Sequence, residues 1–89
     1  MDSATYGRVA RVLTAVAGVP PEQVAPDVRL GSLGFDSLTL LEVGLALHTE
    51  FAVEIDDAAV ARAVVVADLV TVVTAASGHT SYTAQSPER

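Results

Sequence analysis

Aliphatic side chains recur at intervals of three and four residues in three separate segments of this 89-residue chain. This spacing places them on one face of an α-helix, and no segment of useful length alternates in the way typical of a β-strand. A chain of this length has room for one small core. The sequence therefore predicts an all-α fold, a small four-helix bundle of three longer helices and one short one. The predicted longer helices extend from Ser3 to Gly18, from Asp36 to about Phe51, and through Val66 to an end near Ala75 to Gly78; the short one lies within Ala58 to Ala63.

The segment between the first two long helices, residues 18–36, is rich in proline and glycine. A loop of this length is uncommon in a small domain unless it is anchored or functional. Val24, Val28, Leu30 and Leu33 recur through it, so we expect a long ordered loop whose aliphatic side chains hold it against the core. From Ser77 onward the chain is polar and aperiodic. We therefore expect one folded domain over residues 1–76 and a disordered polar tail over residues 77–89.

The chemical inventory argues against an enzyme or a metalloprotein. There is no cysteine, so neither a disulfide nor a thiolate metal site can form. The two histidines have no metal-ligand spacing, and we interpret both as solvent-facing. The chain also contains no nucleophile motif and no glycine-rich phosphate loop, so we expect neither catalysis nor a bound metal.

The net negative charge of the chain is concentrated in one segment. Eleven acidic residues stand against five arginines, giving a net charge of −6, which disfavours nucleic acid and anionic membrane surfaces as partners. Arg62 and Asp68 interrupt the longest apolar tract, which argues against a membrane span. No basic segment precedes an apolar stretch at the start, so we expect a cytoplasmic protein. The net charge resides between residues 36 and 57, which hold six acids and no Arg or Lys: Asp36, Glu42, Glu50, Glu54, Asp56 and Asp57.

The predicted second long helix has two apolar faces. At 100° per residue its larger side chains separate into two groups on nearly opposite sides, and a helix on the outside of a small bundle can bury only one group. We expect one group to face the core and the other to form an exposed strip. The core group is Leu40, Val43, Leu47 and Phe51, and the exposed group is Leu38, Leu41 and Leu45. The competing interpretation is that the loop and the tail cover Leu41 and Leu45.

The start of this helix contains the run LGFDSL, residues 33–38. Asp36 is well placed to accept hydrogen bonds from the free N–H groups of the first turn, and Ser37 occupies the next position. Capping explains Asp36. It does not explain the serine, the glycine before it, or the exposed strip after it.

At these residues the sequence resembles the acyl carrier proteins, most specifically in the run LGFDSLTLLEVGLALHTEFAVEID from Leu33 to Asp56. The resemblance implies an acyl carrier domain over residues 1–76, with a 4′-phosphopantetheine arm transferred from coenzyme A to Ser37 and Asp36 beside it. It also implies acyl intermediates held as thioesters on the thiol of the arm, which agrees with the absence of cysteine. A phosphodiester on Ser37 would lie at a helix N-terminus, where an anion is favoured.

The resemblance further implies partner enzymes: a phosphopantetheinyl transferase, and acyltransferases, ketosynthases or similar enzymes with basic docking patches. The partner-binding residues expected are Leu38, Leu41, Glu42 and Leu45, with a rim of Asp36, Glu42 and Glu50. We expect a monomer, and the Met1 start and polar tail favour a free-standing carrier over a domain excised from a larger synthase.

The chain departs from the family pattern in three respects. The family often has a Pro between Ile and Asp after the second helix, where this chain has Asp56. Val65 stands where the family usually has a Thr or Ser that caps the last helix. The second helix is also less acidic than in fatty-acid carriers, with Thr39, Leu40, His48 and Thr49 where acids are common, which favours polyketide or related specialised biosynthesis, such as that of an antibiotic. Two alternatives stay open: an aminoacyl or peptidyl carrier of a nonribosomal pathway, and an unmodified helical adaptor that binds partners through its exposed leucines.

Overall fold

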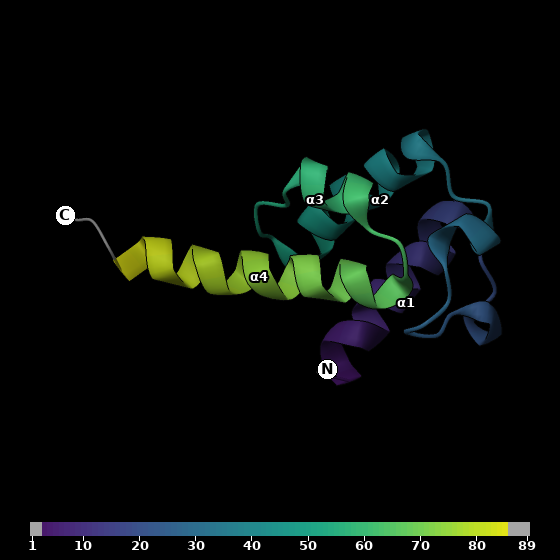
Figure 1. The fold of residues 1–89 in the computed structure, drawn as a ribbon. Helices are drawn as coiled ribbons and strands as arrows, with labels where there is room; N and C mark the ends of the chain where they lie inside the picture. The colour runs from purple at the N-terminus through teal and green to yellow at the C-terminus, as the bar shows by residue number, and fades with distance from the viewer. Residues whose placement is uncertain (1–2, 86–89) are drawn as a thin grey trace.

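The computed structural model describes residues 3–85, and from residue 77 to residue 85 it describes the backbone only. The predicted all-α architecture is confirmed: within these residues the one β-type pairing is an isolated antiparallel bridge between Arg29 and Val65. Four α-helices and two short 3₁₀ turns form the bundle (Figure 1). In chain order they are α1 (Ser3–Ala17), η1 (Pro21–Gln23), η2 (Leu30–Leu33), α2 (Ser37–Phe51), α3 (Asp57–Arg62) and α4 (Val66–Gln85).

The core consists of aliphatic side chains from all four α-helices, as their spacing predicts. Each long helix contributes one stripe, and the short α3 contributes Val60. Because no aromatic ring among the residues with described side chains is fully buried, the stability of the core depends on close interdigitation of small branched side chains. The buried core residues are Val9, Val12, Leu13, Leu30, Val43, Leu47, Val60, Val66, Leu69, Val70 and Val73.

The long loop between α1 and α2 is ordered and anchored, as expected. Gly18 adopts a φ of +73°, which ends α1, and Leu30 is buried while Val24, Val28 and Leu33 pack partly buried against the core. The loop also supplies acceptors to α4: the Val66 and Ala67 N–H groups donate to the carbonyls of Val28 and Pro26 at 3.0 and 2.9 Å. The loop backbone thus satisfies two of the free N–H groups at the start of α4.

The start of α4 shows how the chain manages without a Ser or Thr cap. Val65 directly precedes the helix, and Oδ2 of Asp68, one turn later, accepts the Val64 and Val65 N–H groups at 2.8 and 3.1 Å. This is the return half of a capping box, in which the third helical residue reaches back to the residue before the helix. The same two bonds hold the pKa of Asp68 below its ordinary value.

The end of α4 differs from the prediction. The helix does not end near residues 75–78 but continues to Gln85, so most of the segment predicted to be a disordered tail has helical backbone, and residues 86–89 lie outside the described part. Figure 1 shows the C-terminal half of α4 projecting beyond the bundle. The physical reason is that α4 is already nucleated by its buried first half, and the one glycine at position 78 costs a growing helix only about 1 kcal/mol. Between Val66 and Gln85 the chain contains no proline that would interrupt the helix.

The end of α2 is held by contacts from outside the helix. Arg8 on α1 donates from Nη2 to the Glu50 carbonyl at 2.7 Å, and its guanidinium lies over the Phe51 ring, 4.2 Å from the ring centroid. His48 Nδ1 lies 2.6 Å from the Val53 carbonyl, which can only accept, so Nδ1 carries the hydrogen. Ala52 closes the helix in the left-handed conformation, with a φ of 55°.

Candidate functional site

The site begins with the turn that leads into α2. Gly34 adopts a φ of +84° at the end of η2, and Asp36 follows in an extended conformation as the N-cap of α2. Oδ1 of Asp36 accepts the Thr39 N–H at 2.8 Å and the Thr39 hydroxyl at 2.9 Å. The predicted capping role is therefore confirmed. The Thr39 N–H, and after it the Thr39 hydroxyl, hold the pKa of Asp36 below its ordinary value, so the carboxylate is ionised at neutral pH.

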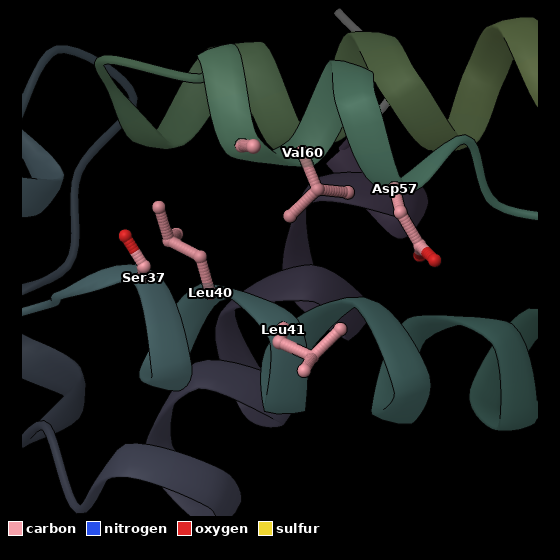
Figure 2. Close-up of a pocket in the computed structure, with 6 residues that line it drawn as sticks. Ser37, Leu40, Leu41, Asp57 and Val60 are labelled. Atoms are coloured by element: carbon pink, nitrogen blue, oxygen red, sulfur yellow. The ribbon is translucent and has the colours of Figure 1, made fainter.

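Ser37 is the first residue of α2, and it is exposed. Its hydroxyl has no hydrogen-bond partner among the described residues, and Figure 2 shows it projecting away from α2 at the mouth of a hollow between α2 and α3. A helix N-terminus offers free N–H groups and a favourable dipole to an anion attached there. The structure thus presents one accessible hydroxyl at the head of a helix, as the sequence predicts.

The hollow beside Ser37 has a volume of about 280 Å³ and mostly apolar walls. Figure 2 shows Leu40 of α2 and Val60 of α3 pointing toward one another across it, with the Asp57 carboxylate at its side. Its α3 walls were not among the predicted site residues, because nothing in the local sequence pattern says that the short helix packs over α2. The lining residues are Ser37, Leu40, Leu41, Asp57, Val60 and Ala61.

The exposed strip on α2 is as predicted. Leu38, Leu41 and Leu45 are 63%, 48% and 60% exposed, whereas Val43 and Leu47 on the other side of the helix are fully buried. The interpretation that the loop covers Leu41 and Leu45 is wrong within the described residues. Three large apolar side chains on one exposed helix face, close to a free hydroxyl, form a surface suited to contact with another protein.

The charged rim of this strip is smaller than the sequence suggested. Glu50 is not a free charge, because its Oε2 accepts a hydrogen bond from Arg8 Nε at 2.9 Å. Asp36 and Asp56 cap α2 and α3, the latter by accepting the Ala58 and Ala59 N–H groups. Glu42 is exposed and forms no ion pair within the described residues. Of the predicted rim, Glu42 and the capping Asp36 therefore carry the acidic character of the face, rather than Glu50.

The described residues contain no group of three or more His, Asp or Glu side chains that could hold a metal ion. Within the same residues no helix has the length and hydropathy needed to cross a membrane. His48 is exposed but lies at the other end of α2, where its Nδ1–H is engaged by Val53. The arrangement can therefore offer a hydroxyl and an apolar docking face to a partner, and the carboxylate next to that hydroxyl, Asp36, is engaged as the cap of α2.

Known proteins resemble this chain in amino-acid sequence. Residues 7–73 match the family described as "Phosphopantetheine attachment site". An acyl carrier protein of Zymomonas mobilis is 36% identical over 69 residues, which cover 76% of this chain and 88% of the relative. An acyl carrier protein of Nitratidesulfovibrio vulgaris strain DP4 is 41% identical over 51 residues, covering 56% of this chain and 67% of the relative.

The matched segment spans α1 to the buried half of α4 and includes the whole of α2 with Ser37 at its head. Proteins of this family carry a 4′-phosphopantetheine group and act as carriers without catalytic activity of their own. The fold, the free serine at the head of α2 and the two relatives agree. The chain belongs to the acyl carrier protein family, as a carrier of 4′-phosphopantetheine and not as an enzyme.

Proposed function

We propose that this chain is a discrete carrier that holds biosynthetic intermediates on a 4′-phosphopantetheine arm attached to Ser37, in polyketide or related specialised biosynthesis. The observation that supports this most strongly is the exposed Ser37 hydroxyl at the head of α2, directly beside an exposed apolar strip. When bound, the arm supplies the terminal thiol on which acyl groups are carried as thioesters.

The residues around Ser37 suit such a group. The hydroxyl is unpaired within the described residues, and the N-terminus of α2 favours an attached phosphodiester by about 0.3–1 kcal/mol. Because Asp36 already accepts the Thr39 N–H, the phosphodiester would share the helix end with one carboxylate. The apolar hollow formed by Leu40, Leu41 and Val60 is a place where a short apolar cargo would be shielded from water.

Partner enzymes would dock on the strip formed by Leu38, Leu41 and Leu45. We propose that Glu42 contributes the charge that steers this face toward basic patches, so that association rates fall as ionic strength rises. The partners are a phosphopantetheinyl transferase, and acyltransferases, ketosynthases or other enzymes of the pathway. The carrier's contribution is positional, because tethering raises the effective concentration of cargo at each partner.

The specialised pathway is supported by the composition of α2. Thr39, Leu40, His48 and Thr49 occupy positions where fatty-acid carriers commonly have acids, and the helix carries only two acidic residues, Glu42 and Glu50. One of these two is paired with Arg8. A docking face with so little negative charge suits partners that recognise it mainly by apolar contact. We further propose that residues 1–76 are the carrier domain, that the protein acts as a monomer and that it acts in the cytoplasm.

The experiment that tests this function is intact mass spectrometry of the protein purified from its native host, followed by release and identification of the cargo. The proposal expects a fraction of the protein to carry phosphopantetheine with a polyketide-type acyl group. An amino acid or peptide on the arm would identify an aminoacyl or peptidyl carrier instead. Protein that is never modified, in the host or by an added transferase, would identify an adaptor.

A further inference from the structure

The first turn of α2 contains a hydrogen bond beyond those that ordinary capping needs. Thr39 donates twice to one oxygen, Oδ1 of Asp36: its N–H makes the usual capping bond at 2.8 Å, and its hydroxyl adds a second bond at 2.9 Å. The acid stands at the N-cap and the hydroxyl at the third helical position, which reverses the residue types of the common capping box. The second bond also fixes the side-chain rotamer of Thr39, so the carboxylate is held in one orientation over the helix end.

The fixed carboxylate directly precedes Ser37 in the chain. Acidic and hydroxyl side chains at helix starts readily hydrogen-bond to their neighbours, so an unrestrained Asp36 could accept the Ser37 hydroxyl. In the structure both hydrogen bonds to Asp36 Oδ1 come from Thr39, and Ser37 Oγ has no partner among the described residues. A serine hydroxyl that donates to Asp36 would have to break that hydrogen bond before it could give its proton to a base on the transferase.

We propose that Thr39 is a positioning residue for the modification of Ser37: by engaging the Asp36 carboxylate it keeps the Ser37 hydroxyl free and the first turn of α2 ordered for the transferase. This inference rests on the proposed function. In the transfer, Ser37 Oγ bonds to the phosphorus of the pantetheine phosphate and the pyrophosphate bond of coenzyme A breaks. Adenosine 3′,5′-bisphosphate leaves, and the hydroxyl proton passes to a base or water on the transferase. Thr39 takes no part in these bond changes and acts through Asp36.

The test compares Thr39→Val, which keeps the shape and removes the donor, with Thr39→Ser, which keeps the donor. Each apo-protein is incubated with coenzyme A, Mg²⁺ and a purified broad-specificity phosphopantetheinyl transferase, and initial rates are followed by intact mass. We expect Thr39→Val to lower kcat/KM for the carrier about threefold to tenfold, and Thr39→Ser to stay within about twofold of the wild type. Thr71→Val is the matched control, because Thr71 also donates its hydroxyl within a helix, to the Ala67 carbonyl, but on α4. It should leave the rate unchanged.

A second readout follows the hydrogen bond itself. Carbon-13 NMR of the Asp36 carboxyl should show its pKa moving toward the ordinary value in Thr39→Val and staying low in Thr39→Ser, because the hydroxyl is one of the two main causes of the lowered pKa. The proposal is overturned if Thr39→Val is modified at the wild-type rate, or if Thr39→Ser is as slow as Thr39→Val. It is also overturned if slow modification of Thr39→Val accompanies a loss of helical circular dichroism, which would make the role structural. An unmodified wild-type protein would instead refute the proposed function.

Discussion

At the scale of single residues, α2 shows that the direction in which a side chain points decides whether it is buried or exposed. Leu45 and Leu47 are two residues apart on α2, yet Leu45 is 60% exposed and Leu47 is fully buried. The same residue type therefore serves a docking face at one position and the core at the other. The two positions offer a matched pair for testing the docking strip.

We predict that Leu45→Asp leaves the fold intact and lowers transfer by partner enzymes about tenfold, because it places a charge within an apolar contact. Leu45 is the better choice than Leu41, since Leu41 also lines the hollow beside Ser37. Circular dichroism and partner-catalysed acyl transfer are the two measurements. Leu47→Asp is the control and should unfold the protein, because it buries an unpaired charge. Wild-type transfer by Leu45→Asp would show that the strip is not a docking surface.

A second residue-scale prediction concerns Ala52, which adopts the left-handed conformation at the end of α2. A Cβ atom is strained in that region, so Ala52→Gly should raise the free energy of unfolding by about 0.5–1 kcal/mol. Chemical denaturation measures this change in the free energy of unfolding. Ala15→Gly, on the exposed side of α1, is the control and should lower the free energy of unfolding by up to about 1 kcal/mol, because that alanine lies in regular helix. Equal losses in both variants would contradict the argument.

At the scale of secondary-structure elements, the helix ends explain where the chain departs from its pattern. The start of α4 has no capping side chain at Val65, and losing such a cap ordinarily costs about 1 kcal/mol. Asp68 and the carbonyls of the loop take the place of the missing cap. The start of α4 is thus stabilised by groups outside the capping position, and local sequence patterns do not reveal such contacts.

Because Asp68 takes the place of the cap, the stability of the fold should depend on pH. The folded pKa of Asp68 lies below its ordinary value of 3.8, so its contribution to stability is fully present above that value and is lost as the pH falls through the folded pKa. Thermal melts of the wild type should therefore decline steeply below about pH 4. The Asp68→Asn variant should have a lower melting temperature at pH 7, and its melting temperature should decline less steeply as the pH falls. Parallel acid profiles for the two proteins would mean that Asp68 does not stabilise the start of α4.

At the scale of the whole molecule, the net charge of −6 comes from residues 36–57, where six acids occur without an Arg or Lys. One of them, Glu50, is paired with Arg8, which lies 42 residues earlier in the chain, and the other five form no ion pair within the described residues. Like charges gathered in this way repel one another and destabilise the folded state, and dissolved salt screens that repulsion.

We predict that raising NaCl from about 20 to about 200 mM, or adding Mg²⁺, raises the melting temperature, because the screening length shortens. The double variant Glu42→Gln/Glu54→Gln should melt higher than the wild type at low salt and respond less to added salt. Glu22→Gln, outside the acidic segment, is the control and should behave as the wild type. A wild-type melt that is indifferent to both salts would count against self-repulsion.

The limits of sequence reasoning follow from what a local pattern records. Spacing predicted the helices, the buried face of α2 and its exposed strip, because each depends on residues within one turn or one helix. The role of Ser37 was implied by the resemblance to acyl carrier proteins. The hollow beside Ser37 requires α3 to pack over α2, which brings Asp57, Val60 and Ala61 to the site. The pairing of Glu50 with Arg8 and the capping by Asp68 are likewise contacts between separated segments. The end of α4 was misjudged because polar composition does not by itself stop a helix that has already formed.

The most direct test of the account is the modification of Ser37 itself. Wild-type apo-protein, Ser37→Ala and the control Ser32→Ala, an exposed serine in the preceding loop, are each incubated with coenzyme A, Mg²⁺ and a broad-specificity phosphopantetheinyl transferase. Intact mass spectrometry then measures the product. The account predicts the mass gain of one phosphopantetheine on the wild type and on Ser32→Ala, mapped to the peptide that contains Ser37, and none on Ser37→Ala. An equal gain on Ser37→Ala, or no gain on any of the three, would contradict it.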